Sequence, residues 1–173
     1  MKHTIFLTED QIQEICKNLG AQLTEKFKDK TPLFVGILKG CHPFMSDLLK
    51  HVDCDLTIDY MQVSSYEGAF STGNVKIKKD LDYDISGRDV VIIEDIIDTG
   101  TTMHNLKNIL SQRNPKSITI VSFLDKPSRR KIEIKADFVG KTIDDLFVIG
   151  YGFDYNQKYR NLPFVTIYEG EDE

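Results

Sequence analysis

Residues 90–103 read Val90-Val91-Ile92-Ile93-Glu94-Asp95-Ile96-Ile97-Asp98-Thr99-Gly100-Thr101-Thr102-Met103. The run from Val90 to Ile93 is wholly apolar and β-branched, which is typical of a parallel strand that is buried on both faces. Two adjacent carboxylates follow, the chain then turns through Asp98-Thr99-Gly100, and hydroxyl side chains open a segment with helical spacing. A buried strand that leads through a turn into a helix is the repeating unit of an α/β fold.

The same alternation continues on both sides of this stretch. Thr8 and Gln11 have the spacing of a capping box, so we expect a helix that begins there and ends before Pro32. Pro43 suits the first turn of a second helix, and a third is expected over residues 101–110. The expected strands are 33–38, 56–63, 90–93 and 117–124. Together they predict a central, mainly parallel sheet flanked by helices, with ligands at the carboxyl ends of its strands.

The chain changes character after Lys135. Three short strand candidates, 138–139, 147–149 and 164–167, follow one another without intervening helices. We therefore expect one domain over residues 1–173, with a core at about residues 8–135 and a small hood lobe formed largely by residues 136–173. The N-terminal residues are a further candidate part of the hood.

Bulk composition excludes several classes of protein. The 173 residues are 40% hydrophobic and carry a net charge of -5, which argues against non-specific binding to nucleic acid. No apolar run reaches the length of a membrane span, and the N-terminus lacks the apolar core of a signal peptide. The three cysteines form no CxxC pair, and the four histidines show no HxxxH spacing, so a zinc site would need distant ligands. A cytoplasmic protein is expected.

The segment from Glu94 to Thr102 has the composition of a site for a phosphorylated sugar. A helix start offers unpaired N–H groups and the positive end of the helix dipole, and Gly100 allows close approach of the backbone. Glu94 and Asp95 can accept hydrogen bonds from sugar hydroxyls or hold a hydrated magnesium ion. The simpler alternative is a capped turn beside a solvated acidic pair. No G-x-x-x-x-G-K-[ST] or G-x-G-x-x-G pattern occurs, which argues against P-loop and dinucleotide-binding enzymes.

At these residues a family resemblance emerges. Val91–Thr102 resembles the phosphoribosyl pyrophosphate signature of type I phosphoribosyltransferases, and among them the hypoxanthine-guanine family. Leu38-Lys39-Gly40-Cys41 resembles its pyrophosphate loop, usually Leu-Lys-Gly-Gly, so that Cys41 departs from the pattern. Ser65-Tyr66 with Ser71-Thr72-Gly73 resembles its mobile closing loop. Lys126 with Arg130, Phe147 to Tyr151, Asp154-Tyr155-Asn156 and Arg160 match its purine-binding end, so the likeness covers about residues 33–168.

The resemblance implies a type I phosphoribosyltransferase fold, Mg²⁺ as cofactor and a homodimer or homotetramer. It implies transfer of the phosphoribosyl group from phosphoribosyl pyrophosphate to a 6-oxopurine, hypoxanthine or guanine, in purine salvage. Asp98 is the candidate general base. The implied ligands of pyrophosphate are Lys39, Gly40 and Arg160, those of the 5′-phosphate are Thr99, Gly100, Thr101 and Thr102, and those of ribose are Glu94 and Asp95. The implied purine contacts are Lys126, Phe147 and Val148, the closing loop is Ser65-Tyr66, and the implied metal ligands are Glu94, Asp95 and Asp154.

Two other readings remain open at this point. An enzyme that prefers xanthine would share the signature and differ in contacts near the second carbon of the purine. A non-catalytic regulator could use the sugar-phosphate site to sense nucleotides while it binds nucleic acid, but such a protein should have a basic face. The basic cluster here, Lys126 with Arg129, Arg130 and Lys131, is short. We therefore expect no nucleic-acid or membrane partner.

Overall fold

A central six-stranded sheet organises the molecule, and its strand order is β4-β3-β2-β5-β6-β7. The computed structural model describes residues 4–65 and 75–170. The strands of this sheet are β2 (Leu33–Leu38), β3 (Thr57–Ser65), β4 (Val75–Lys79), β5 (Asp89–Ile97), β6 (Ser117–Asp125) and β7 (Phe138–Thr142). Every neighbouring pair is parallel except β3 with β4. The predicted mainly parallel α/β sheet is confirmed.

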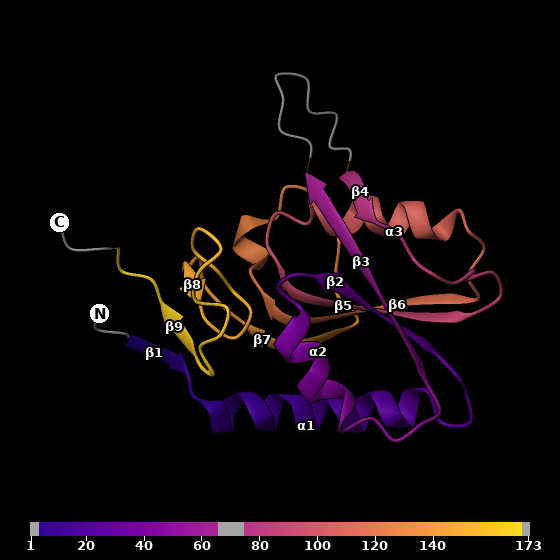
Figure 1. Ribbon diagram of the computed structural model, residues 1–173, viewed down its shortest axis with the longest axis horizontal. Helices are drawn as coiled ribbons and strands as arrows, with labels where there is room; N and C mark the ends of the chain where they lie inside the picture. Colours follow the sequence, from indigo (N-terminus) through magenta and orange to yellow (C-terminus); the bar gives the residue numbers. More distant parts are fainter. Residues whose placement is uncertain (1–3, 66–74, 171–173) are drawn as a thin grey trace.

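Helices cover both faces of this sheet. The helices are α1 (Glu9–Lys26), α2 (His42–Leu49) and α3 (Thr101–Ser111), with a short 3-10 turn, η1, at Pro127–Arg129. α1 and α2 lie on one face and α3 on the other (Figure 1). Side chains alternate between the two faces along β5. Val91 and Ile93 belong to the core under α1 and α2, and Val90 and Ile92 belong to the core under α3. Within the part of the chain that is described, none of the helices has the length and apolar character needed to cross a bilayer.

The start of α1 shows that a local signal can be strong enough to predict an element. The Gln11 backbone N–H donates to the Thr8 hydroxyl at 3.2 Å, and the Gln11 side-chain oxygen accepts from the Thr8 N–H at 2.9 Å. The predicted capping box is therefore present and satisfies two of the donors that a helix start leaves unpaired.

Replacing the cap should destabilise the fold measurably. We expect Thr8→Ala to lower the free energy of unfolding by about 0.5–2 kcal/mol, because the Gln11 N–H at the helix start loses its acceptor. Thr8→Ser keeps the acceptor and serves as the control. Urea denaturation followed by circular dichroism measures the stability of both variants. An alanine variant as stable as the serine variant would show that the capping box does not stabilise the fold.

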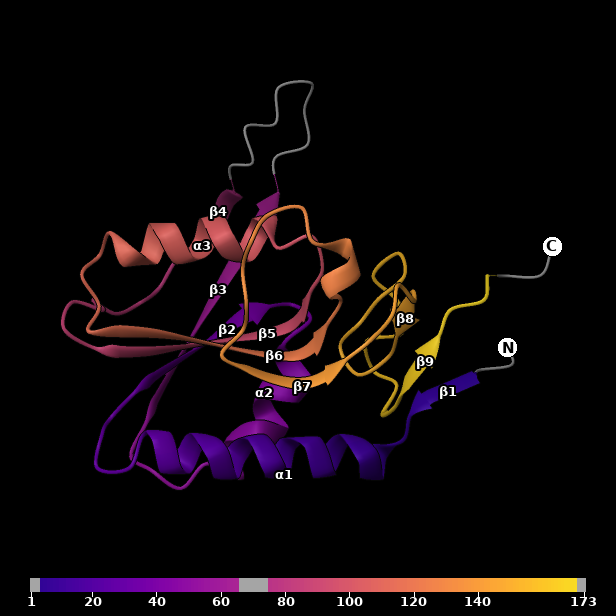
Figure 2. The same cartoon turned by 180° about the vertical axis from the view of Figure 1, so that it is seen from behind.

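The hood is a separate three-stranded sheet of order β1-β9-β8 at one end of the molecule (Figure 2). Its strands are β1 (Thr4–Leu7), β8 (Val148–Ile149) and β9 (Val165–Ile167), so both ends of the described chain meet there. One expectation differs from the structure. The strand candidate 138–139, expected in the hood, belongs to β7 (Phe138–Thr142) on the edge of the main sheet, because Val121 to Asp125 of β6 offer a free parallel edge and Phe138 packs on the core.

Candidate functional site

Three of the predicted binding segments meet at one edge of the main sheet. β2, β5 and β6 are neighbours and run parallel, so their carboxyl ends lie side by side. Lys39-Gly40 follows β2, the bend at residues 98–102 follows β5, and Lys126 follows β6. This is the edge at which open α/β sheets bind their ligands.

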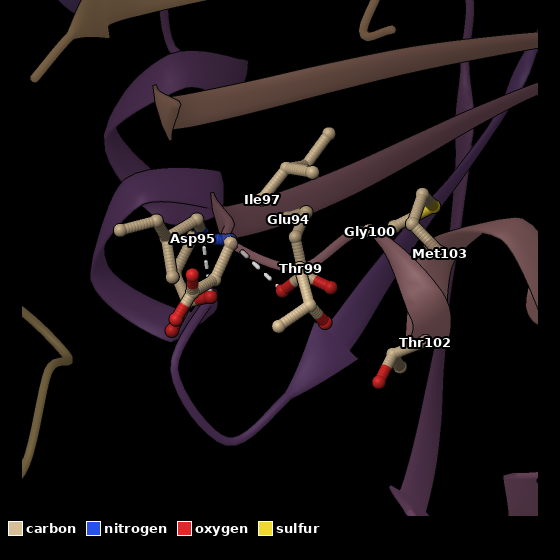
Figure 3. A pocket seen from close by; sticks show the side chains of 9 residues that line it. Glu94, Asp95, Ile97, Thr99, Gly100, Thr102 and Met103 are labelled. Atoms are coloured by element: carbon tan, nitrogen blue, oxygen red, sulfur yellow. Dashed lines mark hydrogen bonds between the residues drawn. The ribbon is translucent and has the colours of Figure 1, made fainter. Parts of the chain in front are cut away.

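A pocket of about 160 Å³ opens at the 98–102 bend (Figure 3). Its walls are residues 94–100 together with Thr102 and Met103. Gly100 has a left-handed φ of 84° immediately before α3, and a Cβ there would lie 2.6 Å from Cγ2 of Ile134. Only glycine fits this conformation and this contact. Thr101 is not one of the wall residues, and its hydroxyl instead lies 3.4 Å from that of Thr99.

Glu94 and Asp95 lie inside β5, whereas the sequence pattern ended the buried strand at Ile93. The strand continues because Ile96 and Ile97 keep their parallel register with Leu124 and Asp125. The Glu94 side chain is buried, and burial followed by the nearby Asp95 charge raises its pKa well above the ordinary value. Burial also raises the pKa of Asp95, although backbone hydrogen bonds and Arg160 oppose the shift. The pair therefore resists carrying two negative charges until a cation or hydrogen-bond donors arrive.

The raised pKa of Glu94 predicts a gain in stability for Glu94→Gln. A carboxyl whose folded pKa exceeds the unfolded value stabilises the fold below that unfolded value, and this contribution is lost as pH rises through the folded pKa. The parent therefore begins to lose this stability above pH 4.5, the ordinary pKa of the Glu94 carboxyl. The glutamine side chain of the variant does not titrate, so the variant does not lose it. We expect the variant to exceed the parent in unfolding free energy at about pH 8 and to approach it at about pH 4. Exposed Glu14→Gln is the control, and equal stability of parent and Glu94→Gln at both pH values would contradict the burial argument.

The loop after β2, Lys39-Gly40, packs between Asp95 and Gly152 of the hood. A Cβ on Gly40 would lie 1.8 Å from Oδ2 of Asp95, and a Cβ on Gly152 would lie 2.2 Å from the Gly40 carbonyl oxygen. Lys39 is exposed, and its peptide bond with Leu38 is cis. The backbone of this loop thus lies within reach of whatever Asp95 binds.

Cys41, which departs from the family pattern, faces the interior. Its side chain is fully buried, and its N–H donates to the Ile37 carbonyl at 3.4 Å. Burial, with Glu94 and Asp95 nearby, raises the pKa of this thiol, so it is not an activated nucleophile. The substitution therefore leaves Lys39 and Gly40 to present the donors of the loop.

Charged side chains link the proposed base to the proposed purine reader. Lys126 is buried, with Nζ 3.9 Å from a carboxylate oxygen of Asp145. Arg129 lies 3.2 Å from Asp98 through Nε and 3.5 Å from Asp145 through Nη1. Asp98 and Lys126 are thus connected through Arg129 and Asp145, two residues that the sequence analysis did not assign to the site.

The hood presents an exposed aromatic ring, Phe147, two residues after Asp145. Phe147 is 52% exposed, so it is not the core phenylalanine that a strand pattern also allows. Tyr155 and Tyr168 contact it edge-on, with ring centroids at 6.2 and 5.7 Å. Val148 is buried in β8. An exposed, edge-supported ring can stack on a planar base.

Asp154 and Arg160 pair with each other in the hood. Arg160 Nη2 lies 3.1 Å from the Asp154 carboxylate, and Nη1 donates to the Gly152 carbonyl at 2.7 Å. Neither residue is among the walls of the pocket. Across residues 4–65 and 75–170, no three acidic, histidine or cysteine side chains form a ready metal site, so Glu94, Asp95 and Asp154 do not come together as one cluster.

Comparison with known proteins places this geometry in a family. A family model described as phosphoribosyl transferase domain matches residues 6–156. The hypoxanthine-guanine phosphoribosyltransferase of Bacillus subtilis (strain 168) is 53% identical over 171 residues, covering 96% of this chain and 95% of the relative. The protein of the same name from Staphylococcus aureus (strain Mu50 / ATCC 700699) is 54% identical over 162 residues, covering 93% and 90%. The chain belongs to the hypoxanthine-guanine phosphoribosyltransferase family.

Solved structures of the family agree with this fold. A crystal structure of a hypoxanthine phosphoribosyltransferase from Staphylococcus aureus superposes with a TM-score of 0.92 at 53% identity, over 95% of this chain and 90% of that one. A hypoxanthine-guanine phosphoribosyltransferase from Bacillus anthracis also gives 0.92, at 40% identity, over 96% and 99%. The fold predicted from the alternating strands and helices is confirmed, and so is the family that the resemblance over about residues 33–168 implied.

For this phosphoribosyltransferase, the residue roles expected from the sequence stay predictions. The structure brings Gly40, the acidic pair and the 98–102 bend together, and it leaves Asp154 paired with Arg160. Tyr66 and residues 71–73 lie outside the described residues, as does the side chain of Ser65. Arg130, which the resemblance placed with Lys126 at the purine-binding end, contacts the start of the 98–102 bend instead. Arg129 and Asp145 were missed as site neighbours, because no local spacing marks a charge that reaches the site from a loop.

Proposed function

We propose that this chain transfers the 5-phosphoribosyl group from phosphoribosyl pyrophosphate to hypoxanthine or guanine, which gives IMP or GMP and pyrophosphate. One observation carries the proposal: a helix-start pocket with hydroxyl walls includes the acidic pair, the buried Glu94 and the half-buried Asp95, at the carboxyl edge of the sheet. A phosphate monoester suits the first feature and a ribose diol suits the second. Sequence identity above half to proteins named for this reaction supports the assignment.

The sugar phosphate would be held by the pocket. The backbone N–H groups of the 98–102 bend, with the hydroxyls of Thr99, Thr101 and Thr102, would donate to the 5′-phosphate. Glu94 and Asp95 would accept from the ribose hydroxyls. Fixing both ends of the ribose orients its anomeric carbon toward the hood, where the purine would enter.

The purine would be read by Lys126, Phe147 and Val148. Lys126 would donate to the 6-oxo oxygen, an acceptor that adenine lacks. Phe147 would stack on the ring, and the Val148 backbone would bind the purine edge. Asp98 would take the ring proton as the purine nitrogen attacks the anomeric carbon and the bond to pyrophosphate breaks.

The departing pyrophosphate would be stabilised by Lys39, the Gly40 backbone and Arg160. Lysine and the planar donor fork of arginine both suit a multiply charged anion. Arg160 lies in the hood beside Gly152, whose backbone approaches the Gly40 carbonyl. Arg160 and the Lys39-Gly40 loop therefore lie near enough to each other to bind the same pyrophosphate group. The closing loop that begins at Ser65-Tyr66 would exclude water from the activated sugar.

The donor set fits magnesium as a cofactor held jointly with substrate. Mg²⁺ prefers oxygen ligands and is usually bound by one or two carboxylates together with substrate phosphates. Glu94 and Asp95 are adjacent carboxylates whose raised pKa values a cation would oppose. Asp154 would supply a further carboxylate ligand from the hood once Arg160 leaves it to bind pyrophosphate. When bound, the ion would neutralise charge on the pyrophosphate group.

A purine panel tests the proposed reaction. The protein is mixed with magnesium, phosphoribosyl pyrophosphate and, in turn, hypoxanthine, guanine, xanthine or adenine, and pyrophosphate release is measured. We expect release with hypoxanthine and guanine and little with adenine. Release with xanthine alone would establish the xanthine-preferring alternative. No release with any purine, in a protein that binds IMP, would favour the non-catalytic regulator.

We also propose that the protein is cytoplasmic and forms a homodimer or homotetramer. Light scattering measures the mass of the assembly in solution.

A further inference from the structure

Arg130 contacts the start of the 98–102 bend and is largely buried, with 16% of its side chain exposed. Its guanidinium contacts four oxygen acceptors. Nη1 donates to the carbonyls of Ile97 at 3.2 Å and Asp98 at 3.0 Å. Nε donates to the Ile134 carbonyl at 3.0 Å, and Nη2 pairs with the Asp125 carboxylate at 2.6 Å. One side chain thus joins the ends of β5 and β6 to the first residue of the bend.

The neighbouring backbone continues this contact. The Lys131 N–H donates to the Thr99 carbonyl at 2.9 Å. The carbonyls of Ile97, Asp98 and Thr99 are therefore all directed toward segment 130–131. Each of these carbonyls shares a planar peptide with the next N–H, and in a trans peptide the two groups point in opposite directions.

This geometry fixes the direction of three N–H groups. The N–H groups of Asp98, Thr99 and Gly100 must point away from Arg130, and these three residues line the pocket. Successive N–H groups on one side of a bend form a concavity that binds anions. Gly100 rests directly on this support, because a Cβ there would lie 3.1 Å from Cδ of Arg130.

We propose that Arg130 is a positioning residue that presets the N–H groups of Asp98, Thr99 and Gly100 for a phosphate monoester without touching the phosphate itself. The inference rests on the proposed function, because it assumes that the pocket takes the 5′-phosphate. Donors that are already aimed need no reorganisation when the anion arrives, which strengthens binding. Lysine cannot replace this arginine fully, since a single ammonium lacks the planar fork that reaches acceptors on three segments.

Ligands with and without the phosphate separate positioning from general stability. We would measure the affinities of inosine 5′-monophosphate and inosine by calorimetry for the parent, Arg130→Met and Arg130→Lys. Arg113→Met is the matched control, because it breaks an arginine–aspartate pair with Asp80, at 2.8 Å, outside the site. We expect Arg130→Met to weaken binding of the monophosphate about 10- to 100-fold and that of inosine less than about twofold. Arg130→Lys should fall between the parent and Arg130→Met, and Arg113→Met should match the parent.

Two results with the Arg130 variants would overturn the inference. Equal losses for both ligands would show that Arg130 only supports the fold, and unchanged affinity for the monophosphate would show that it does not orient the bend. If thermal unfolding shows that Arg130→Met does not fold, Arg130→Lys is judged by the same criterion. A parent that binds the monophosphate more tightly than inosine but releases no pyrophosphate would refute the proposed reaction and leave this inference standing. A parent without that preference would refute both.

Discussion

Asp98→Asn should lower kcat about 10²- to 10⁴-fold, the range that a positioned general base contributes. Asparagine keeps the shape of the side chain and an oxygen that Arg129, 3.2 Å from Asp98, can still approach. It cannot accept the purine proton. The KM for phosphoribosyl pyrophosphate should change little, because the phosphate, ribose and pyrophosphate ligands are untouched. Steady-state kinetics with hypoxanthine measures both quantities.

A matched control separates proton transfer from the loss of an ion pair. Asp80→Asn removes the charge of another aspartate that pairs with an arginine, Arg113, at 2.8 Å. That variant should turn over like the parent. Unchanged turnover in Asp98→Asn would remove Asp98 from the base role, and an equal fall in both variants would point to a general electrostatic effect.

Lys126→Met should abolish most of the preference for 6-oxopurines. Methionine keeps the length of the buried stem and loses the ammonium, so the 6-oxo oxygen is left without its charged donor. We expect kcat/KM with hypoxanthine to fall about 100-fold, the size of one charged hydrogen bond, and the ratio of hypoxanthine to adenine to fall with it. Competition between the two purines measures this ratio directly.

The control for this variant is an exposed lysine on β7, the strand next to β6. Lys141→Met changes an exposed side chain of β7 and should leave the ratio at the parent value. If Lys126→Met used hypoxanthine as well as the parent, the assignment of Lys126 as the reader of the 6-oxo group would be wrong.

Local signals in the sequence predicted the elements that local physics decides. The capping box at Thr8 and Gln11 is formed by residues three apart, and the Val90 to Ile93 run is itself wholly apolar and is buried. The continuation of β5 through Glu94 and Asp95 depends on its pairing with β6, which no pattern within the strand reveals. For the same reason residues 138–142 could not be distinguished from hood strands, because the free edge of β6 is a property of the assembled sheet.

The site follows the same division. Gly100 and the hydroxyl residues after it are contiguous, so their phosphate-binding character can be predicted from the sequence. Arg130 reaches the bend from about thirty residues away through a loop, and its four acceptors include three backbone carbonyls that carry no side-chain signal. The pairing of Arg160 with Asp154 depends on positive φ angles at Asn156, Gln157 and Tyr159, which turn the intervening loop back on itself.

We expect the 98–102 bend to bind the phosphate of a ribose 5-phosphate group. A crystal structure of the protein with IMP tests it most directly. We expect the phosphate among the N–H groups and hydroxyls of residues 99–102, with the ribose hydroxyls on Glu94 and Asp95 and the base beside Phe147. A structure in which IMP is bound elsewhere, or in which this bend contains no phosphate at saturating nucleotide, would contradict the assignment.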